Sequence, residues 1–225
     1  IADSLKNVGI ESVIRENEYK IRKMICSNEQ ASIKIEPNYI IRGCIKPTQF
    51  IQTSQRVQEL YGFAAIDVLS FSELYGGKIC AALDRQHPRD LFDIKLLLEN
   101  EGIQQVKEGF FVALLGHNRP AHEILNPNIQ NQEKTLEKEF SGMTEEYFSY
   151  EEHVTTMYRL IDAIHKVITE QNKQFLISFF SAEPQWNLLE IKNLKNLPAI
   201  KWKLQNLGIV PLTPSSVEFL NQQAY

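Results

Sequence analysis

Several features that would assign this chain of 225 residues to a specialised class of protein are absent from it or scarce. It has only three cysteines, Cys26, Cys44 and Cys80, an odd number with no Cys-x-x-Cys pair. This argues against a disulfide framework and a zinc site, and predicts buried, reduced thiols in a cytosolic protein. No apolar run approaches the roughly 18 residues of a transmembrane helix, and no signal peptide is present.

The chain also lacks an excess of basic residues. Its 24 Lys and Arg are outnumbered by 28 Asp and Glu, giving a net charge of −4. A broad electrostatic nucleic-acid binder is therefore disfavoured, although a local basic patch stays open. Internal repeats and low-complexity tracts are absent as well. Apolar and charged contents of 43% and 23% are those of an ordinary soluble globular protein.

The first part of the sequence mixes helix and strand patterns. Residues 1–10 resemble the last turns of a helix closed by Gly9. Alternating apolar and polar residues predict strands over 19–26 and 31–43, joined as an antiparallel hairpin by the turn at 27–30. A short apolar run predicts a further strand over 63–70.

From residue 70 onward the patterns are helical. Ser70 and Glu73 have capping-box spacing at the start of a helix that we expect to reach Arg85. Pro88 suits the first turn of a second helix, which ends near Asn100. Further helices are predicted over 103–115, 131–141, 151–171, 173–181 and 197–208, with a loop over 116–128. The fold class is therefore α+β, with a domain at 1–102 and an all-helical domain at 103–225.

The stretch "ELYGGKICAALDRQHPRDLFDIKLL" gathers charges around the joint between the first two of these helices. Lys78 and Arg85 are seven residues apart and share one helical face, and Asp90 and Asp93 share a face of the next helix. Carboxylates at a helix start are stabilised by its dipole. One interpretation is a salt-bridged helical hairpin; the other is part of a ligand site.

Two further features bear on this choice. Each glycine of the Gly76-Gly77 pair costs a helix about 0.5–1 kcal/mol relative to alanine. A pair is tolerated where a ligand or another backbone must come close. Glu36 lies on the polar face of its predicted strand. It either faces solvent or faces a cleft beside Asp90 and Asp93.

Four segments resemble one known family. The segment "SFSELYGGKICAALDRQHPRDLFDIKLLLENEG" is similar to the lysine and Arg-Asp-x-x-Asp motifs of AbiEii/AbiGii-type toxins. These are nucleotidyltransferase-like proteins of bacterial type IV toxin–antitoxin and abortive-infection systems. The segment "IKIEPNYIIRG" resembles the strand before those motifs. "LLGHNRPAHEILNPN" and "LPAIKWKLQNL" resemble the helical C-terminal region, so that the resemblance spans residues 5–208.

This resemblance implies a polymerase-beta-like enzyme that uses Mg²⁺ and a nucleoside triphosphate (NTP) to transfer a nucleotidyl group. In that interpretation Lys78 contacts the triphosphate, and Arg85 and Arg89 bind phosphate or brace the motif. Asp93, with Asp90, orients the lysine or acts in acid–base or metal chemistry. Glu36 is then a carboxylate near the metal.

Two motifs expected of the family are missing: a Gly-Gly-Thr/Ser loop and an Asp-x-Asp metal pair. None of the six aspartates is separated from another by one residue. The chain also begins without methionine, in what reads as the middle of a helix. We therefore expect an N-terminally truncated or decayed nucleotidyltransferase domain that is inactive by itself.

Three functions remain open at this stage. The first is the toxin nucleotidyltransferase, with RNA as the expected acceptor, a cognate antitoxin as partner and the bacterial cytoplasm as location. The second is a non-catalytic module that binds an antitoxin or self-associates. The third is a metal-dependent nuclease using Glu36, Asp90 and Asp93. A basic cluster near the C-terminus is usually a solvated face but could meet RNA: Lys192, Lys195, Lys201 and Lys203.

Overall fold

The computed structural model describes residues 2–16, 22–36 and 43–208. The chain forms two compact units, residues 1–41 and residues 42–225.

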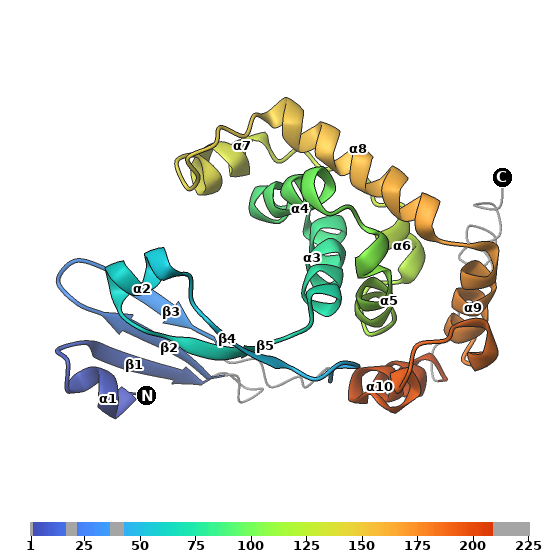
Figure 1. Ribbon diagram of the computed structural model, residues 1–225, viewed down its shortest axis with the longest axis horizontal. Helices are drawn as coiled ribbons and strands as arrows, with labels where there is room; N and C mark the ends of the chain where they lie inside the picture. The colour runs from blue at the N-terminus through green and yellow to red at the C-terminus, as the bar shows by residue number, and fades with distance from the viewer. Residues whose placement is uncertain (1, 17–21, 37–42, 209–225) are drawn as a thin grey trace. The chain divides into compact units, whose positions relative to one another are not determined.

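The first unit is a short helix followed by a small antiparallel sheet (Figure 1). Helix α1 spans Ala2–Lys6, and Gly9 follows it with a positive φ of 75°. Strands β1 (Glu11–Glu16), β2 (Arg22–Ser27) and β3 (Ser32–Ile35) pair in the order β1-β2-β3.

Register in this sheet follows the alternation of apolar residues. Met24 lies opposite Ile35 and Cys26 opposite Ile33, so all four share one face, where Met24 and Cys26 are buried. The predicted β2–β3 hairpin is confirmed. Strand β1 was missed by the sequence analysis. β3 ends at Ile35, whereas residues 37–42 of the predicted strand lie outside the described residues.

The second unit begins with two antiparallel strands that are connected by a helix. Strand β4 (Gln49–Gln52) pairs antiparallel with β5 (Ala65–Val68), and helix α2 (Gln55–Tyr61) connects them. Only β5 was predicted. Ser54 caps α2 by accepting a hydrogen bond from the backbone N–H of Val57, and Gly62 ends it at φ 86°.

Helices α3 (Phe71–Arg85) and α4 (Pro88–Asn100) lie where the sequence predicts them. Ser70 accepts from the Glu73 N–H, as expected for a cap. The Glu73 carboxylate does not return to the Ser70 backbone, however. It accepts hydrogen bonds from the Ser70 hydroxyl and from the backbone N–H groups of Ile45 and Lys46, at 2.6 Å for Ile45 and 3.3 Å for Lys46. The capping pair therefore also fastens the preceding chain to α3.

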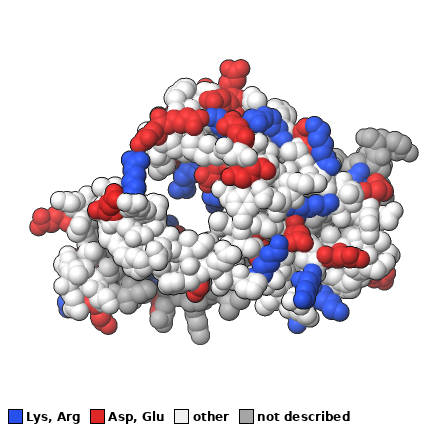
Figure 2. Space-filling model, viewed as in Figure 1, with Lys and Arg blue, Asp and Glu red and all other residues white. Residues whose placement is uncertain are grey.

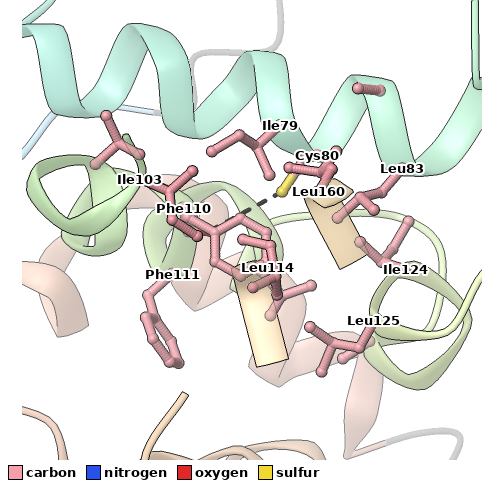
Figure 3. Packing of buried hydrophobic residues seen from close by; sticks show 14 of the residues in the cluster. Ile79, Cys80, Leu83, Ile103, Phe110, Phe111, Leu114, Ile124, Leu125 and Leu160 are labelled. Atoms are coloured by element: carbon pink, nitrogen blue, oxygen red, sulfur yellow. Dashed lines mark hydrogen bonds between the residues drawn. The ribbon is translucent and has the colours of Figure 1, made fainter. Parts of the chain in front are cut away.

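The closest packing in this unit is between α3 and α5 (Lys107–Leu115), which follows the short 3₁₀ turn η1 (Gln104–Val106). A Cβ on Gly76 would lie 2.1 Å from the Gly109 carbonyl carbon, and one on Gly109 would lie 1.9 Å from the Ser72 carbonyl oxygen. The two backbones therefore touch at glycines. Around this crossing α3 and α5 contribute Ile79, Leu83, Phe110 and Leu114 to the buried core (Figure 3).

The remaining helices complete the core. Helix α8 (Tyr150–Val167) runs along α4 and α6 (Figure 1). Thr169 caps the start of a new helix by accepting a hydrogen bond from the Asn172 N–H. The predicted helix over 151–171 therefore ends early, at Val167. The predicted loop over 116–128 contains a short helix, α6. The other elements are α6 (Ala121–Leu125), α7 (Glu133–Thr135), the π-helical η2 (Leu136–Phe140), α9 (Glu170–Phe180), η3 (Trp186–Leu188), η4 (Leu194–Asn196) and α10 (Pro198–Leu207).

The α+β class with antiparallel sheet and a helical C-terminal region is confirmed. The boundary near residue 102 stays a prediction, and α3 and α5 pack closely across it. Cys26 and Cys80 are buried free thiols, but Cys44 is exposed, contrary to expectation, because it lies in irregular chain before β4. Among the described helices, none combines the length and apolar character needed to cross a membrane.

Candidate functional site

Asp90 joins the two helices of the α3–α4 hairpin. Its carboxylate accepts from Arg85 Nε at 2.6 Å and Nη2 at 3.1 Å, and lies 3.4 Å from Lys78 Nζ. The Asp90 side chain is only 3% exposed. A carboxylate buried to this degree between two cations braces the hairpin and offers no free face to a ligand.

Asp93 and Lys78 form the accessible part of the same cluster. Lys78 Nζ lies 2.9 Å from Asp93 Oδ2, and the two side chains are 34% and 43% exposed. Asp93 lies one turn after Asp90 on the same face of α4, so that Lys78 reaches both carboxylates, but Asp93 is at the surface and Asp90 is inside. The ammonium is therefore neutralised but can be reached from solvent.

The pKa values follow from this geometry. Burial by itself raises the pKa of Asp90, but the hydrogen bond and charge of Arg85, helped by Lys78, lower it below the usual value. Burial lowers the pKa of Lys78, but hydrogen bonding to Asp93 and the charges of Asp93 and Asp90 raise it overall. Both groups are therefore charged at neutral pH.

The open face of α3 carries small residues between cations. Leu74, Gly77, Lys78, Ala81 and Arg85 recur at helical spacing, and none of them is buried. A Cβ on Gly77 would meet no atom within 4 Å, in contrast to Gly76. The glycine pair thus has two explanations: Gly76 allows α5 to approach, whereas Gly77 leaves a bare stretch of helix beside Lys78.

Arg89 and His87 stand at the start of α4. The Arg89 side chain is exposed and forms no ion pair with any residue that the structure describes. His87 caps the helix, since its Nδ1 accepts from the Arg89 N–H at 3.2 Å. Arg89 is therefore a cation with no carboxylate to hold it.

Glu36 belongs to the other unit of the chain. It follows β3 and is paired with Lys34 at 2.9 Å and Lys23 at 3.5 Å, while 46% of its side chain is exposed. The hydrogen bond from Lys34 is the main reason why the pKa of Glu36 is lowered. Its proposed role beside Asp90 and Asp93 stays a prediction.

The carboxylates of the hairpin do not fit a metal site by themselves. Within residues 2–16, 22–36 and 43–208, no three His, Cys, Asp or Glu side chains come together as a cation would need. Asp90 is engaged by two cations and Asp93 by one. Hard cations such as Mg²⁺ require several oxygen ligands.

The fold is that of an α+β protein whose helical hairpin holds lysine, arginine and aspartate at one joint. In comparison with known proteins, the family model of the nucleotidyl transferase AbiEii toxin, Type IV TA system, matches residues 3–206. The chain belongs to this family. Neither a curated protein nor a solved structure matches this chain. Family membership implies a nucleoside triphosphate as substrate and an antitoxin as partner.

The structure brings together Lys78, Arg85, Asp90 and Asp93 as the sequence predicts. Sequence reasoning did not separate the buried aspartate from the exposed one, nor Gly76 from Gly77. The only available signal was helical phase: Asp90 falls in line with the apolar residues Ile94 and Leu97, which are buried.

Proposed function

We propose that the α3–α4 hairpin is the phosphate-binding part of a nucleotidyl-transfer site for a nucleoside triphosphate. The observation that carries this proposal is the position of Lys78, which is charged, accessible and next to the bare surface of Gly77. Phosphate oxygens can replace the Asp93 carboxylate around the ammonium without disturbing the buried Arg85–Asp90 pair.

The surrounding charges favour an anion. Arg85 is 61% exposed even though it binds Asp90, so that part of its guanidinium faces solvent. Arg89 adds a third cation. Among these five side chains three are cationic and two are carboxylates, and planar guanidinium groups suit phosphate.

Each residue of the cluster then has a distinct role. Lys78 binds the phosphates as a compact charge, and Asp90 fixes Arg85. Before substrate binds, Asp93 holds the Lys78 ammonium in place. After substrate binds, Asp93 orients Lys78 or accepts a proton. Mg²⁺, which the family implies, supplies charge neutralisation in nucleotidyl transfer. Within the described residues, Asp90 and Asp93 do not form a site for it by themselves.

The wider assignment completes the proposal. We propose an RNA acceptor, a cognate antitoxin and the bacterial cytoplasm, the setting of a type IV toxin–antitoxin system. Self-association stays a prediction. That this chain is inactive by itself is also a prediction, made because the sequence lacks the Asp-x-Asp pair.

Isothermal titration calorimetry with ATP and Mg²⁺ tests the phosphate role. We expect Lys78→Ala to weaken ATP binding at least about tenfold, because a charge-assisted hydrogen bond contributes about 1.5–3 kcal/mol. The control is Lys166→Ala, which removes an exposed lysine of α8 paired only with Asp162. Equal ATP affinity in Lys78→Ala and wild type would overturn the proposal.

Asp93→Asn separates positioning from binding. Removing its charge frees Lys78 from its ion pair, so ATP affinity should stay equal or rise, whereas Lys78→Ala should lower it. If Asp93→Asn loses affinity as strongly as Lys78→Ala, Asp93 does not have the proposed role.

One observation favours a second function, binding of a partner protein. The β4–α2–β5 segment and the start of α3 expose many large apolar side chains, which is unusual for a free surface. They are Phe50, Ile51, Val57, Leu60, Tyr61, Phe63, Ile66, Leu69, Phe71 and Leu74. Light scattering tests this function. We expect a Phe50→Asp variant to lose complex formation with the antitoxin, or self-association, while its ATP affinity is unchanged.

A further inference from the structure

A surface cavity that is open to solvent lies far along the chain from the α3–α4 hairpin, between η3 and η4. It has a volume of about 370 Å³ and is lined by residues from Trp186 to Lys195. Asn193 turns the chain at φ 64°, which closes the segment on itself before η4 begins. Small-molecule sites in proteins are commonly about 300–1,000 Å³.

The walls of this cavity are fixed by the core. The Trp186 ring packs on Phe175 at 5.7 Å and on Phe179 at 6.2 Å between ring centroids, and both phenylalanines are fully buried. Leu189 and Leu194 are buried as well. Because its neighbours on α9 hold the indole, its orientation does not depend on a ligand.

The polar groups at the cavity have no partners within the described part of the chain. The ammonium groups of Lys192 and Lys195 are exposed and form no ion pair there. Neither the indole N–H of Trp186 nor the side-chain amide of Asn193 is hydrogen-bonded to any of these residues. The cavity thus combines an aromatic wall, hydrogen-bond donors, the two positive charges of Lys192 and Lys195 and the negative charge of Glu190.

We propose that this cavity binds a nucleotide unit: a flat base beside Trp186 and a phosphate held by Lys192 and Lys195. A base combines an apolar face with acceptor atoms at its edge, which matches an indole wall flanked by N–H donors. Glu190, which also lines the cavity, can accept a hydrogen bond from an exocyclic amino group. Adenine, cytosine and guanine carry such a group and uracil does not.

The surface next to the cavity extends this pattern. On α10, Lys201 is exposed and Trp202 is 52% exposed. Lysine or arginine side chains lie over the α10 part of the molecule in Figure 2. Lys203 does not belong to this surface, since it is buried and donates to the His117 carbonyl at 2.7 Å.

This site uses none of the residues around Lys78, and in its RNA form it rests on the RNA acceptor of the proposed function. The same chemistry has two sources: a free nucleotide, or one unit of an RNA strand. The first would make the cavity a second mononucleotide site, and the second would make it a place where the acceptor docks.

Tryptophan fluorescence and calorimetry test the site, with AMP and a short adenylate oligoribonucleotide as probes. We expect the double variant Lys192→Ala/Lys195→Ala to bind AMP at least about tenfold more weakly. Lys134→Ala/Lys166→Ala removes the same charge from exposed lysines of α7 and α8 and should bind like wild type. Trp186→Phe keeps a ring in the wall and should weaken binding less than the double variant.

The outcomes are separable. If wild type binds AMP and the oligonucleotide with similar affinity, and the double variant binds both more weakly, the ligand is a free nucleotide. Much tighter binding of the oligonucleotide than of AMP indicates RNA. The proposal is overturned if wild type binds neither probe, or if the double variant binds both as wild type does. Lys78→Ala should retain AMP binding here, so failure at this cavity leaves the hairpin proposal untouched, and the reverse also holds.

Discussion

The adjacent glycines of α3 offer a sharp test of the packing described above. Gly76→Ala and Gly77→Ala make the same chemical change at neighbouring positions of one helix. Alanine favours a helix over glycine by about 0.5–1 kcal/mol at either position. Any difference between the two variants therefore reports on what the added methyl group contacts.

At Gly76 the methyl group would lie 2.1 Å from the Gly109 carbonyl carbon and 2.3 Å from the Phe110 nitrogen. Both atoms are backbone and cannot turn aside, so α5 must move away from α3. Such overpacking commonly costs about 1–3 kcal/mol, more than the helix gain. At Gly77 there is no atom within 4 Å. We therefore expect Gly76→Ala to destabilise the protein and Gly77→Ala to stabilise it by about 0.5–1 kcal/mol.

Urea unfolding followed by far-ultraviolet circular dichroism measures both variants, since the second unit holds nearly all of the helix. The midpoint should fall for Gly76→Ala and rise for Gly77→Ala. Equal midpoints for the two variants would refute the assignment of Gly76 to the α3–α5 contact. The ATP affinity of Gly77→Ala adds an independent measurement: the proposed phosphate site predicts weaker binding despite the higher stability.

Three further predictions follow from single contacts. Asp90→Asn should cost about 1–3 kcal/mol at pH 7, because Asp90 is buried between Arg85 and Lys78, although the exposure of Arg85 keeps the loss towards the lower end. The folded-state pKa of Asp90 lies below its usual value of 3.8, so this stabilisation is present above about pH 4 and is lost as pH falls through the folded-state pKa. Denaturation at neutral and acidic pH measures this, and the unfolding free energies of wild type and variant should converge at acidic pH. His153 is buried with Nδ1 lacking any partner among the residues that the structure describes, and burial lowers its pKa. Stability should therefore decrease as pH falls below about 6.5, and His153→Gln should reduce this slope in pH-dependent melting. Thr169→Ala should lower the unfolding free energy by about 0.5–2 kcal/mol in urea titrations, because it removes the cap that separates α9 from α8; an unchanged midpoint would show that this cap is dispensable.

Local sequence signals determined where the three longest helices begin. Ser70, Pro88 and Ser149 mark the starts of α3, α4 and α8, because a capping hydrogen bond or a fixed proline φ involves residues within one turn. The apolar alternation of β2 and β3 likewise gave their hairpin. The same local pattern brought Lys78, Arg85, Asp90 and Asp93 to one joint. Elements that were missed, such as β4 and α2, are short and expose their apolar residues. Their sequences therefore carry no periodic apolar pattern that predicts a strand or a helix.

The tertiary structure alone decided which of these residues face the core. Gly76 meets Gly109 from a helix more than thirty residues away, whereas Gly77 meets nothing. Glu73 has the spacing of a capping box but binds the backbone of Ile45 and Lys46. Asp90 is buried and Asp93 exposed, and Lys203 leaves the basic cluster to bind a carbonyl. Burial depends on the partners that pack against a helix face, and those partners are distant in sequence. Residue spacing therefore fixes which side chains share a face, and the fold fixes what that face contacts.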